Sequence, residues 1–348
     1  MKVLFGWELG GGQGHIHRLA ALAQTLESYG IEPVFAIKSY NIKGITFPWR
    51  IVFAPSLPFS GRVESYTYTD ILETFGFGNA NLLRSHLNSW QSIISEVKPR
   101  LVITDHAPGL VLASRGVVPT VVTGDSFAVP PPVEVFPPLR LPTPPQLEKR
   151  TQQVSSTVHE IVESNEILGK IFCGDASFIF GIPELDPYHY LRTDYSQYSS
   201  VHITPIPTNL LNPEGSAWAY LYDDYSYRDL VLQTLRPQCE FNPLTEVLAK
   251  KSLAIHHGSS TTAITCLLAG IPQLVFPKHL EHQLNAIALS GLAVAKIINT
   301  PPTWESLLKA QAEAYTLTEN ALQTAQKLAR WNQNFMSVFV KTCFQFLS

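Results

Sequence analysis

The sequence predicts an α/β protein made of two domains, each built on a parallel sheet. Its length of 348 residues corresponds to two domains of roughly 100–200 residues each. Short apolar segments alternate with segments of helical periodicity in both halves of the chain, the pattern that produces a parallel sheet covered by helices. The apolar content of 45% is close to the average for globular proteins and is enough to fill two cores.

The first 125 residues contain the more regular alternation. Expected strands are residues 2–7, 32–38, 51–53, 100–104 and 119–123, and expected helices are residues 15–29 and 82–97. In the first helix Leu19, Leu22 and Leu26 follow helical spacing, and Gly30 is placed to end it. Ligands of such a sheet bind at the carboxyl ends of the strands.

A proline-rich stretch, residues 130–145, follows this region. Prolines at this density exclude a helix or a central strand. The stretch is either a stiff surface connection or a rigid wall beside a ligand pocket.

The remaining elements are again of α/β type. Expected strands are residues 178–180, 218–222, 253–257 and 273–276, and expected helices are residues 146–169, 227–235, 262–268, 284–291, 304–328 and 331–347. We place the domains at residues 1–203 and 204–330, followed by a terminal helix over 331–348.

Composition excludes several classes of protein. Charged residues make up only 15% and the net charge is -3, so a nucleic acid is not expected as the main partner. The chain lacks an apolar run of about 18 residues and a signal-peptide pattern, which predicts a cytoplasmic protein without membrane spans. The four dispersed cysteines, Cys173, Cys239, Cys266 and Cys343, are then expected to be reduced thiols.

A glycine-rich loop with a histidine separates the first strand from the first helix. The loop ELGGGQGH lacks the glycine spacing of a dinucleotide fingerprint and the lysine of a P-loop. A helix N-terminus disfavours imidazolium, so His15 can act as a base. Asp105, at the end of a neighbouring strand, could hydrogen-bond the second ring nitrogen. The simpler alternatives are an exposed or capping His15 and an Asp105 that caps the next helix.

The most informative stretch is residues 255–286, IHHGSSTTAITCLLAGIPQLVFPKHLEHQLNA. A polar loop, His257–Thr262, ends at a helix N-terminus, which is suited to a diphosphate. The acidic Glu281 follows the next strand and could accept hydrogen bonds from sugar hydroxyls. Parallel strands connected by a right-handed crossover bring both to one sheet edge.

This stretch resembles the donor-site motif of GT-B glycosyltransferases, especially glycosyltransferase family 1 and its bacterial relatives. Alignment on Gly270-Ile271-Pro272 places the motif histidine at His257. The loop GGGQGH resembles the acceptor-side motif that carries the catalytic base, so the resemblance implies His15 and Asp105 as catalytic residues. It implies a donor-binding set made of Gly12, Gly14, Phe241, His257, Gly258, Ser259, Ser260, Thr261, Thr262, Glu281 and His282.

The resemblance also implies a fold and a reaction. The fold is GT-B, with two Rossmann-like domains facing a cleft and the terminal helix crossing back to the first domain. The reaction is inverting transfer of a sugar from a nucleotide sugar, most simply a UDP-sugar, to a small-molecule or lipid-like acceptor, without a metal or other cofactor. Ser259 and Thr265 depart from the motif, at a glycine and at a ribose-binding glutamate.

Four alternatives stay open. The pattern GxGHxxR around His15 also resembles GT-B-fold sugar-nucleotide hydrolases, in which water replaces the acceptor. The departures at Ser259 and Thr265 would also suit a non-catalytic sugar-nucleotide-binding homologue. A metal site could be made from His256, His257, His279, His282 and Cys266, among which the pair His279 and His282 has metal-ligand spacing. The apolar terminal helix could contact a membrane surface weakly instead of packing on the protein.

Overall fold

The structure is a computed structural model that forms two compact units. It describes residues 1–11, 14–38, 47–58, 61, 64–193, 198–199, 216–237, 251–299, 301–331 and 335–348. Unit 1 comprises residues 1–180, 187–198 and 335–348, and unit 2 comprises residues 181–186 and 199–334. The boundary expected between residues 203 and 204 lies outside the described residues.

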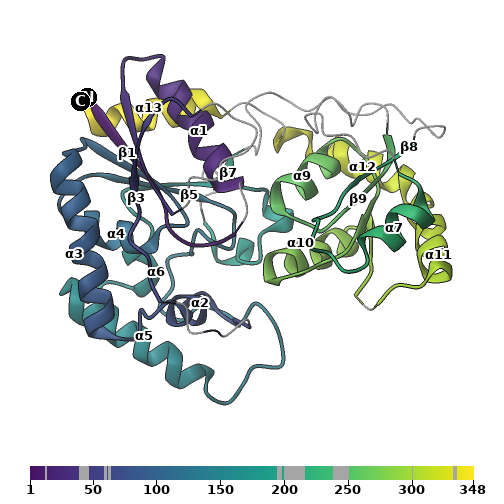
Figure 1. Cartoon of the computed structure of the whole chain (residues 1–348), viewed down its shortest axis with the longest axis horizontal. Coiled ribbons are helices and arrows are strands. Elements are labelled where there is room, and N and C mark those ends of the chain that lie inside the picture. Colours follow the sequence, from purple (N-terminus) through teal and green to yellow (C-terminus); the bar gives the residue numbers. More distant parts are fainter. Residues whose placement is uncertain are drawn as a thin grey trace. The chain divides into compact units, whose positions relative to one another are not determined.

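Unit 1 contains a seven-stranded sheet (Figure 1). Its strand order is β3-β2-β1-β4-β5-β6-β7, and the described pairings from β1 to β6 are parallel. The strands are β1 (Lys2–Trp7), β2 (Glu32–Ile37), β3 (Arg50–Phe53), β4 (Leu101–Asp105), β5 (Thr120–Gly124), β6 (Ala176–Phe180) and β7 (Tyr198–Ser199). The order reverses between β1 and β4, so their carboxyl ends form the topological switch point where such sheets bind ligands.

Two groups of helices pack on this sheet. Helix α1 contacts β1, β2 and β4, and α13 contacts α1 and β4, whereas α3 and α4 contact each other and the strands β1, β4 and β5. The helices of unit 1 are α1 (Gly14–Glu27), α2 (Tyr68–Thr74), α3 (Ala80–Val97), α4 (Pro108–Ser114), α5 (Leu147–Val162), α6 (Leu168–Ile171) and α13 (Met336–Leu347), with the 3₁₀ turn η2 (His189–Leu191). The helix expected over 146–169 ends early, at Val162, because Glu163 adopts a left-handed conformation that ends α5.

The proline-rich stretch is anchored in the core of unit 1. Phe136 is buried against Tyr68, and the backbone N–H of Leu139 donates to the carbonyl of Tyr66 at 2.7 Å. These contacts hold the stretch on the body of unit 1.

The terminal helix begins later than expected, at Met336, and is part of unit 1. Its buried side chains are Met336, Phe339, Cys343 and Leu347. Val338, on another side of the helix, is 55% exposed. The rings of Phe178 and Phe339 meet edge to face at 5.4 Å, so the helix packs on protein.

Unit 2 contains a four-stranded parallel sheet in the order β11-β10-β9-β8. Its strands are β8 (Ser216–Tyr220), β9 (Lys251–His256), β10 (Gln273–Val275) and β11 (Ala295–Ile297). Its helices are α7 (Arg228–Leu235), α9 (Ser260–Leu268), α10 (Leu280–Gly291), α11 (Trp304–Tyr315) and α12 (Thr318–Leu328), with the 3₁₀ turns η1 (Pro183–Leu185) and η5 (Ala329–Trp331). The helical region expected over 304–328 contains two of these helices, α11 and α12.

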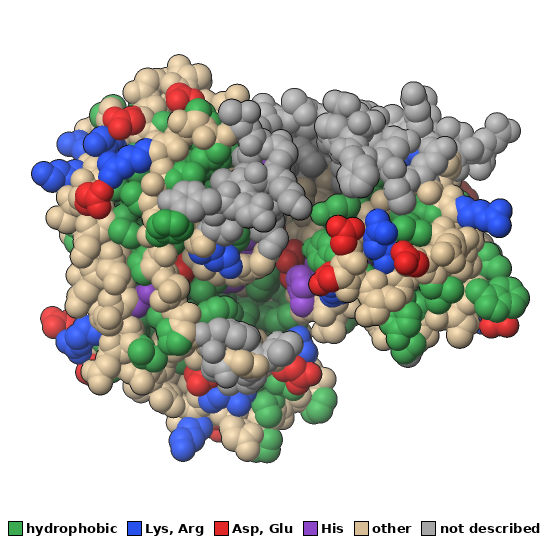
Figure 2. All heavy atoms as spheres, in the orientation of Figure 1, with side chains coloured by type: hydrophobic (Ala, Val, Ile, Leu, Met, Phe, Trp, Pro, Cys, Tyr) green, Lys and Arg blue, Asp and Glu red, His purple; other side chains and the backbone are tan. Residues whose placement is uncertain are grey.

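Three features of the described residues bear on charge, hydropathy and cysteine chemistry. Acidic and basic side chains are interspersed among the described residues on the face shown in Figure 2. Among the described helices, none has both the length and the apolar composition to cross a bilayer. The three described cysteines, Cys173, Cys266 and Cys343, are free thiols.

Candidate functional site

The glycine loop of unit 1 brings His15 to the switch point of the sheet. Strand β1 ends at Trp7, and helix α1 begins at Gly14, one residue before His15. The backbone N–H of Leu9 donates to the carbonyl of His106 at 2.9 Å, which ties the loop to the end of β4. Of the two predicted loop glycines, Gly14 is the first residue of α1 and Gly12 lies outside the described residues.

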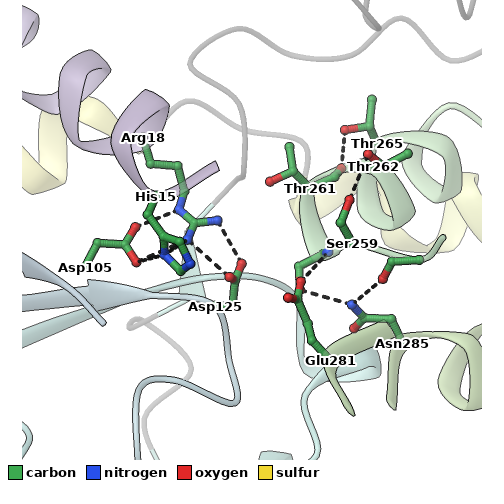
Figure 3. A network of polar contacts seen from close by, with 12 residues as sticks. His15, Arg18, Asp105, Asp125, Ser259, Thr261, Thr262, Thr265, Glu281 and Asn285 are labelled. Atoms are coloured by element: carbon green, nitrogen blue, oxygen red, sulfur yellow. Dashed lines mark hydrogen bonds and ion pairs between the residues drawn. The ribbon is translucent and has the colours of Figure 1, made fainter. Parts of the chain in front are cut away.

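His15 and Asp105 form a buried hydrogen-bonded pair. His15 Nδ1–H donates to Asp105 Oδ1 at 2.7 Å, and both side chains are buried (Figure 3). A carboxylate only accepts, so Nδ1 carries the proton and Nε2 is the nitrogen that can take another. The alternative of Asp105 as a helix cap is wrong, because helix α4 has Ala107 at its N-cap without a side-chain hydrogen bond.

Arg18 and Asp125 extend this pair into a four-residue network. Arg18 Nε donates to Asp105 Oδ2 at 2.9 Å, and its Nη1 and Nη2 donate to the two oxygens of Asp125 at 2.9 and 3.1 Å. Burial by itself would raise the pKa of Asp105, but the charges of Arg18 and His15 hold it below its ordinary value. Asp105 therefore stays ionised beside the imidazole.

The sequence contains a signal for this extension. Asp125 directly follows β5, as Asp105 ends the neighbouring strand β4, so the two carboxylates share one sheet edge. Arg18 lies three residues after His15 on α1, which places both on the same side of the helix. Asp125 was absent from the residues predicted from the sequence.

In unit 2, the predicted loop residues gather at the start of helix α9. Ser259 is the N-cap, and its hydroxyl donates to Thr262 Oγ1 at 3.1 Å. Asn285 Nδ2 donates to the carbonyl of Gly258 at 2.9 Å and to Ser260 Oγ at 3.1 Å. Helix α10 therefore holds the loop in place. Thr261 lies in the first turn of α9, where its carbonyl accepts from Thr265 Oγ1 at 2.5 Å.

Glu281 occupies the helix terminus that the sequence assigned to a diphosphate. Its Oε1 accepts from both the N–H and the hydroxyl of Ser260, each at 2.9 Å (Figure 3). A carboxylate satisfies the unpaired N–H groups and the positive end of a helix dipole, as a phosphate would. The expected division, with the diphosphate on the loop and Glu281 on sugar hydroxyls, concerns a bound donor and stays a prediction; in the structure Glu281 itself binds the start of α9.

His257 is also engaged differently from the expectation. Its Nδ1–H donates to the carbonyl of Phe276 at 2.7 Å, and its Nε2 accepts from the backbone N–H of Tyr222 at 3.0 Å. Burial lowers its pKa, which keeps the ring neutral. In this conformation both ring nitrogens bind the protein, so His257 positions the loop and leaves no nitrogen for a phosphate.

His256 and His282 are two further neutral imidazoles of this unit. His256 Nδ1 accepts from the N–H of Gly258 and its Nε2–H donates to Gln273 Oε1, both at 2.9 Å; burial lowers its pKa to about 4. His282 is buried, with its Nδ1 3.4 Å from the backbone nitrogen of Lys278, and burial lowers its pKa to about 2. Phe241, a member of the predicted donor-binding set, lies outside the described residues.

The metal alternative has a geometric counterpart. His279, Glu281 and His282 each offer a ligand atom, and these atoms lie within 4.8 Å of one another. Glu281 already accepts two hydrogen bonds from Ser260. A metal bound here would compete with the helix cap, and this alternative remains open.

Comparison with known proteins identifies the fold. Residues 232–333 match the family of Erythromycin biosynthesis protein CIII-like C-terminal domains. The solved structure of the glycosyltransferase VinC in complex with dTDP has a TM-score of 0.66 and 14% identity, and the match covers 99% of both chains. The calicheamicin glycosyltransferase CalG4 has a TM-score of 0.64 and 13% identity, covering 99% of this chain and 98% of its own.

Two curated relatives match a shorter stretch. Glycosyltransferase GtfC of Amycolatopsis orientalis is 34% identical over 83 residues, 24% of this chain and 20% of GtfC. Elloramycin glycosyltransferase ElmGT of Streptomyces olivaceus is 34% identical over 84 residues, 24% of this chain and 22% of ElmGT. The match thus spans about a fifth of each relative. The chain has the GT-B fold, and its resemblance to GT-B glycosyltransferases of the bacterial antibiotic-type branch is confirmed.

Proposed function

We propose that the chain is an inverting glycosyltransferase that moves a sugar from a nucleoside-diphosphate sugar to a hydroxyl of a small-molecule acceptor. The observation that carries the proposal is the buried His15–Asp105 pair at the switch point of the first sheet. The names of the relatives GtfC and ElmGT support the reaction class. The solved complex of SpnG with spinosyn aglycone supports a small-molecule acceptor by analogy.

The pair suggests how the acceptor is activated. His15 Nε2 takes the proton of the acceptor hydroxyl, and the oxygen attacks the anomeric carbon as the bond from that carbon to the diphosphate breaks. Asp105, kept ionised by Arg18, stabilises the imidazolium that forms. The attack comes from the face opposite the leaving group, which inverts the anomeric centre.

Unit 2 supplies the donor site in this proposal. The N–H groups at the start of α9 take the diphosphate, and Glu281 moves its hydrogen bonds from Ser260 to the sugar hydroxyls. Glu281 already lies within hydrogen-bond distance of α9, so the exchange needs only a local rearrangement. The helix terminus stabilises the leaving diphosphate electrostatically, so no metal is required. The sequence resemblance favours UDP as the nucleotide of the donor. The second choice is dTDP, because the structure of VinC was solved in complex with it.

The test is nucleotide release from UDP- and dTDP-sugars, with and without a panel of hydroxylated acceptors. Acceptor-dependent release with a glycosylated product supports the transferase. Release that does not depend on acceptor supports the hydrolase, with water as the nucleophile. Binding without release in calorimetry supports a non-catalytic homologue. His15→Ala should lower the rate of release by about 10²–10⁴ in the first two cases. His17→Ala, which removes an imidazole from the same helix, is the matched control.

A further inference from the structure

His106 adopts an unusual backbone conformation beside the proposed base. It follows Asp105 at the end of β4 and has a φ of 49°. The other described non-glycine residues with positive φ all follow helices, where left-handed caps are common; they are Lys98, Glu163, Arg236 and Ala293. Backbone strain of this kind persists only where the surroundings enforce it, and it concentrates at functional sites.

The side chain of His106 has unused hydrogen-bonding capacity. It is 6% exposed, and neither ring nitrogen has a partner among the described residues. Burial and the neighbouring His15 lower its pKa to about 3, so the ring is neutral, with one donor and one acceptor. Buried polar groups are almost always hydrogen-bonded, so an imidazole with two unused nitrogens points to a ligand.

Gly10 lies against both His15 and His106. Its φ is 84°, and a Cβ atom built on it would be 2.7 Å from His15 Nε2 and 3.2 Å from His106 Nδ1. The two nitrogens therefore face the same side of Gly10, and the two ring centroids are 6.0 Å apart. A side chain at position 10 would crowd both rings, so glycine is needed for His15 and His106 to lie this close to the loop.

We propose that His106 is an acceptor-binding residue that hydrogen-bonds a second oxygen of the acceptor while His15 takes the proton of the reacting hydroxyl. This inference rests on the proposed function. Both nitrogens lie within 3.2 Å of one point beside Gly10, so two oxygens on neighbouring carbons can each approach a different nitrogen. The acceptor class is therefore a vicinal diol or a catechol.

The test compares acceptors in matched pairs. Catechol is paired with phenol, and a cyclic 1,2-diol with the corresponding alcohol. For the wild-type chain, the acceptor with two neighbouring oxygens should have a kcat/KM at least tenfold higher than that of its one-oxygen partner. His106→Gly should bring this ratio close to one, mainly through KM. His106→Asn, which keeps a hydrogen-bonding group and tolerates positive φ, should restore part of the ratio.

Lys98→Gly is the control for backbone strain. It also places glycine at a positive φ, at the end of α3, and should leave the acceptor ratio unchanged. Loss of the buried ring should lower the melting temperature of His106→Gly and relief of the positive φ should offset part of that loss, so the acceptor ratio and not the melting temperature decides the role. A lower melting temperature with an unchanged ratio would show that His106 is only structural.

The outcomes separate this inference from the proposed function. Acceptor-dependent transfer without preference for the second oxygen, or with a preference that survives His106→Gly, would overturn the role of His106 alone. Failure of the wild type to transfer to any member of the pairs or of the wider panel would overturn the proposed function, and the role of His106 with it.

Discussion

Acidification should loosen the loop between β9 and α9 through His256. The ring accepts the N–H of Gly258 with one nitrogen and donates to Gln273 with the other, so it must be neutral to make both bonds. Its folded-state pKa of about 4 is below the ordinary histidine value of about 6.5. The unfolded chain therefore binds more protons, and this stabilisation is present above pH 6.5 and is lost as the pH falls towards 4.

The magnitude follows from these two pKa values. Between pH 7 and pH 5 the unfolded histidine becomes protonated, while the folded one stays mostly neutral. Linkage then removes roughly 2 kcal/mol from the free energy of unfolding of unit 2. His282, whose burial lowers its pKa to about 2, acts in the same direction, so the total loss in the wild type is larger.

Hydrogen exchange of peptides from β9 and α9, corrected for the intrinsic rate at each pH, measures this loss locally. In His256→Asn, which keeps an acceptor for Gly258, the loss of protection between pH 7 and pH 5 should be smaller by roughly 2 kcal/mol. His159→Asn, in unit 1, should leave the wild-type loss unchanged. If His256→Asn lost as much protection between pH 7 and pH 5 as the wild type, the role of His256 in the pH dependence would be refuted.

Three further predictions concern the base, the donor site and the terminal helix. His15→Ala should lower the transfer rate by about 10²–10⁴, the range of general base catalysis, with nucleotide affinity in calorimetry nearly unchanged because His15 is on unit 1; near-normal turnover would contradict the role. Glu281→Gln should bind free UDP at least as tightly as the wild type, because it removes negative charge from the start of α9. Its affinity for a UDP-sugar should fall relative to its affinity for free UDP. Equal losses of both affinities in calorimetry would count against the role of Glu281. Phe339→Ala should cost about 3–5 kcal/mol in urea unfolding, against less than about 0.5 for the exposed Val338→Ala; similar costs would mean that the helix is not packed on unit 1.

Much of unit 1 was predictable because its signals are local. The strand expected over residues 2–7 has the same bounds in the structure, Lys2–Trp7, because a short apolar run followed by a glycine loop marks its end. The meeting of His15 and Asp105 follows from topology, because parallel strands carry their last residues to one edge. Asp125 could have been found by the same argument.

The arrangement around α9 was not predictable from local signals. The hydrogen bonds of Glu281 with Ser260, and of His257 with Phe276 and Tyr222, form only because segments far apart in the sequence pack side by side. The motif spacing states which residues meet but not which hydrogen bonds they make. Strand β11, Ala295–Ile297, has only three residues, too few for an alternation pattern to show.

The return of helix α13 to unit 1 has a consequence for biosynthesis. Residues 335–348 complete unit 1, yet the ribosome makes them after all of unit 2. Phe178 packs against Phe339, so a nascent chain that has emerged only through β6 still displays part of that apolar surface. The first unit to be synthesised is thus the last to be completed, and until then its uncovered apolar surface is open to chaperones and to aggregation.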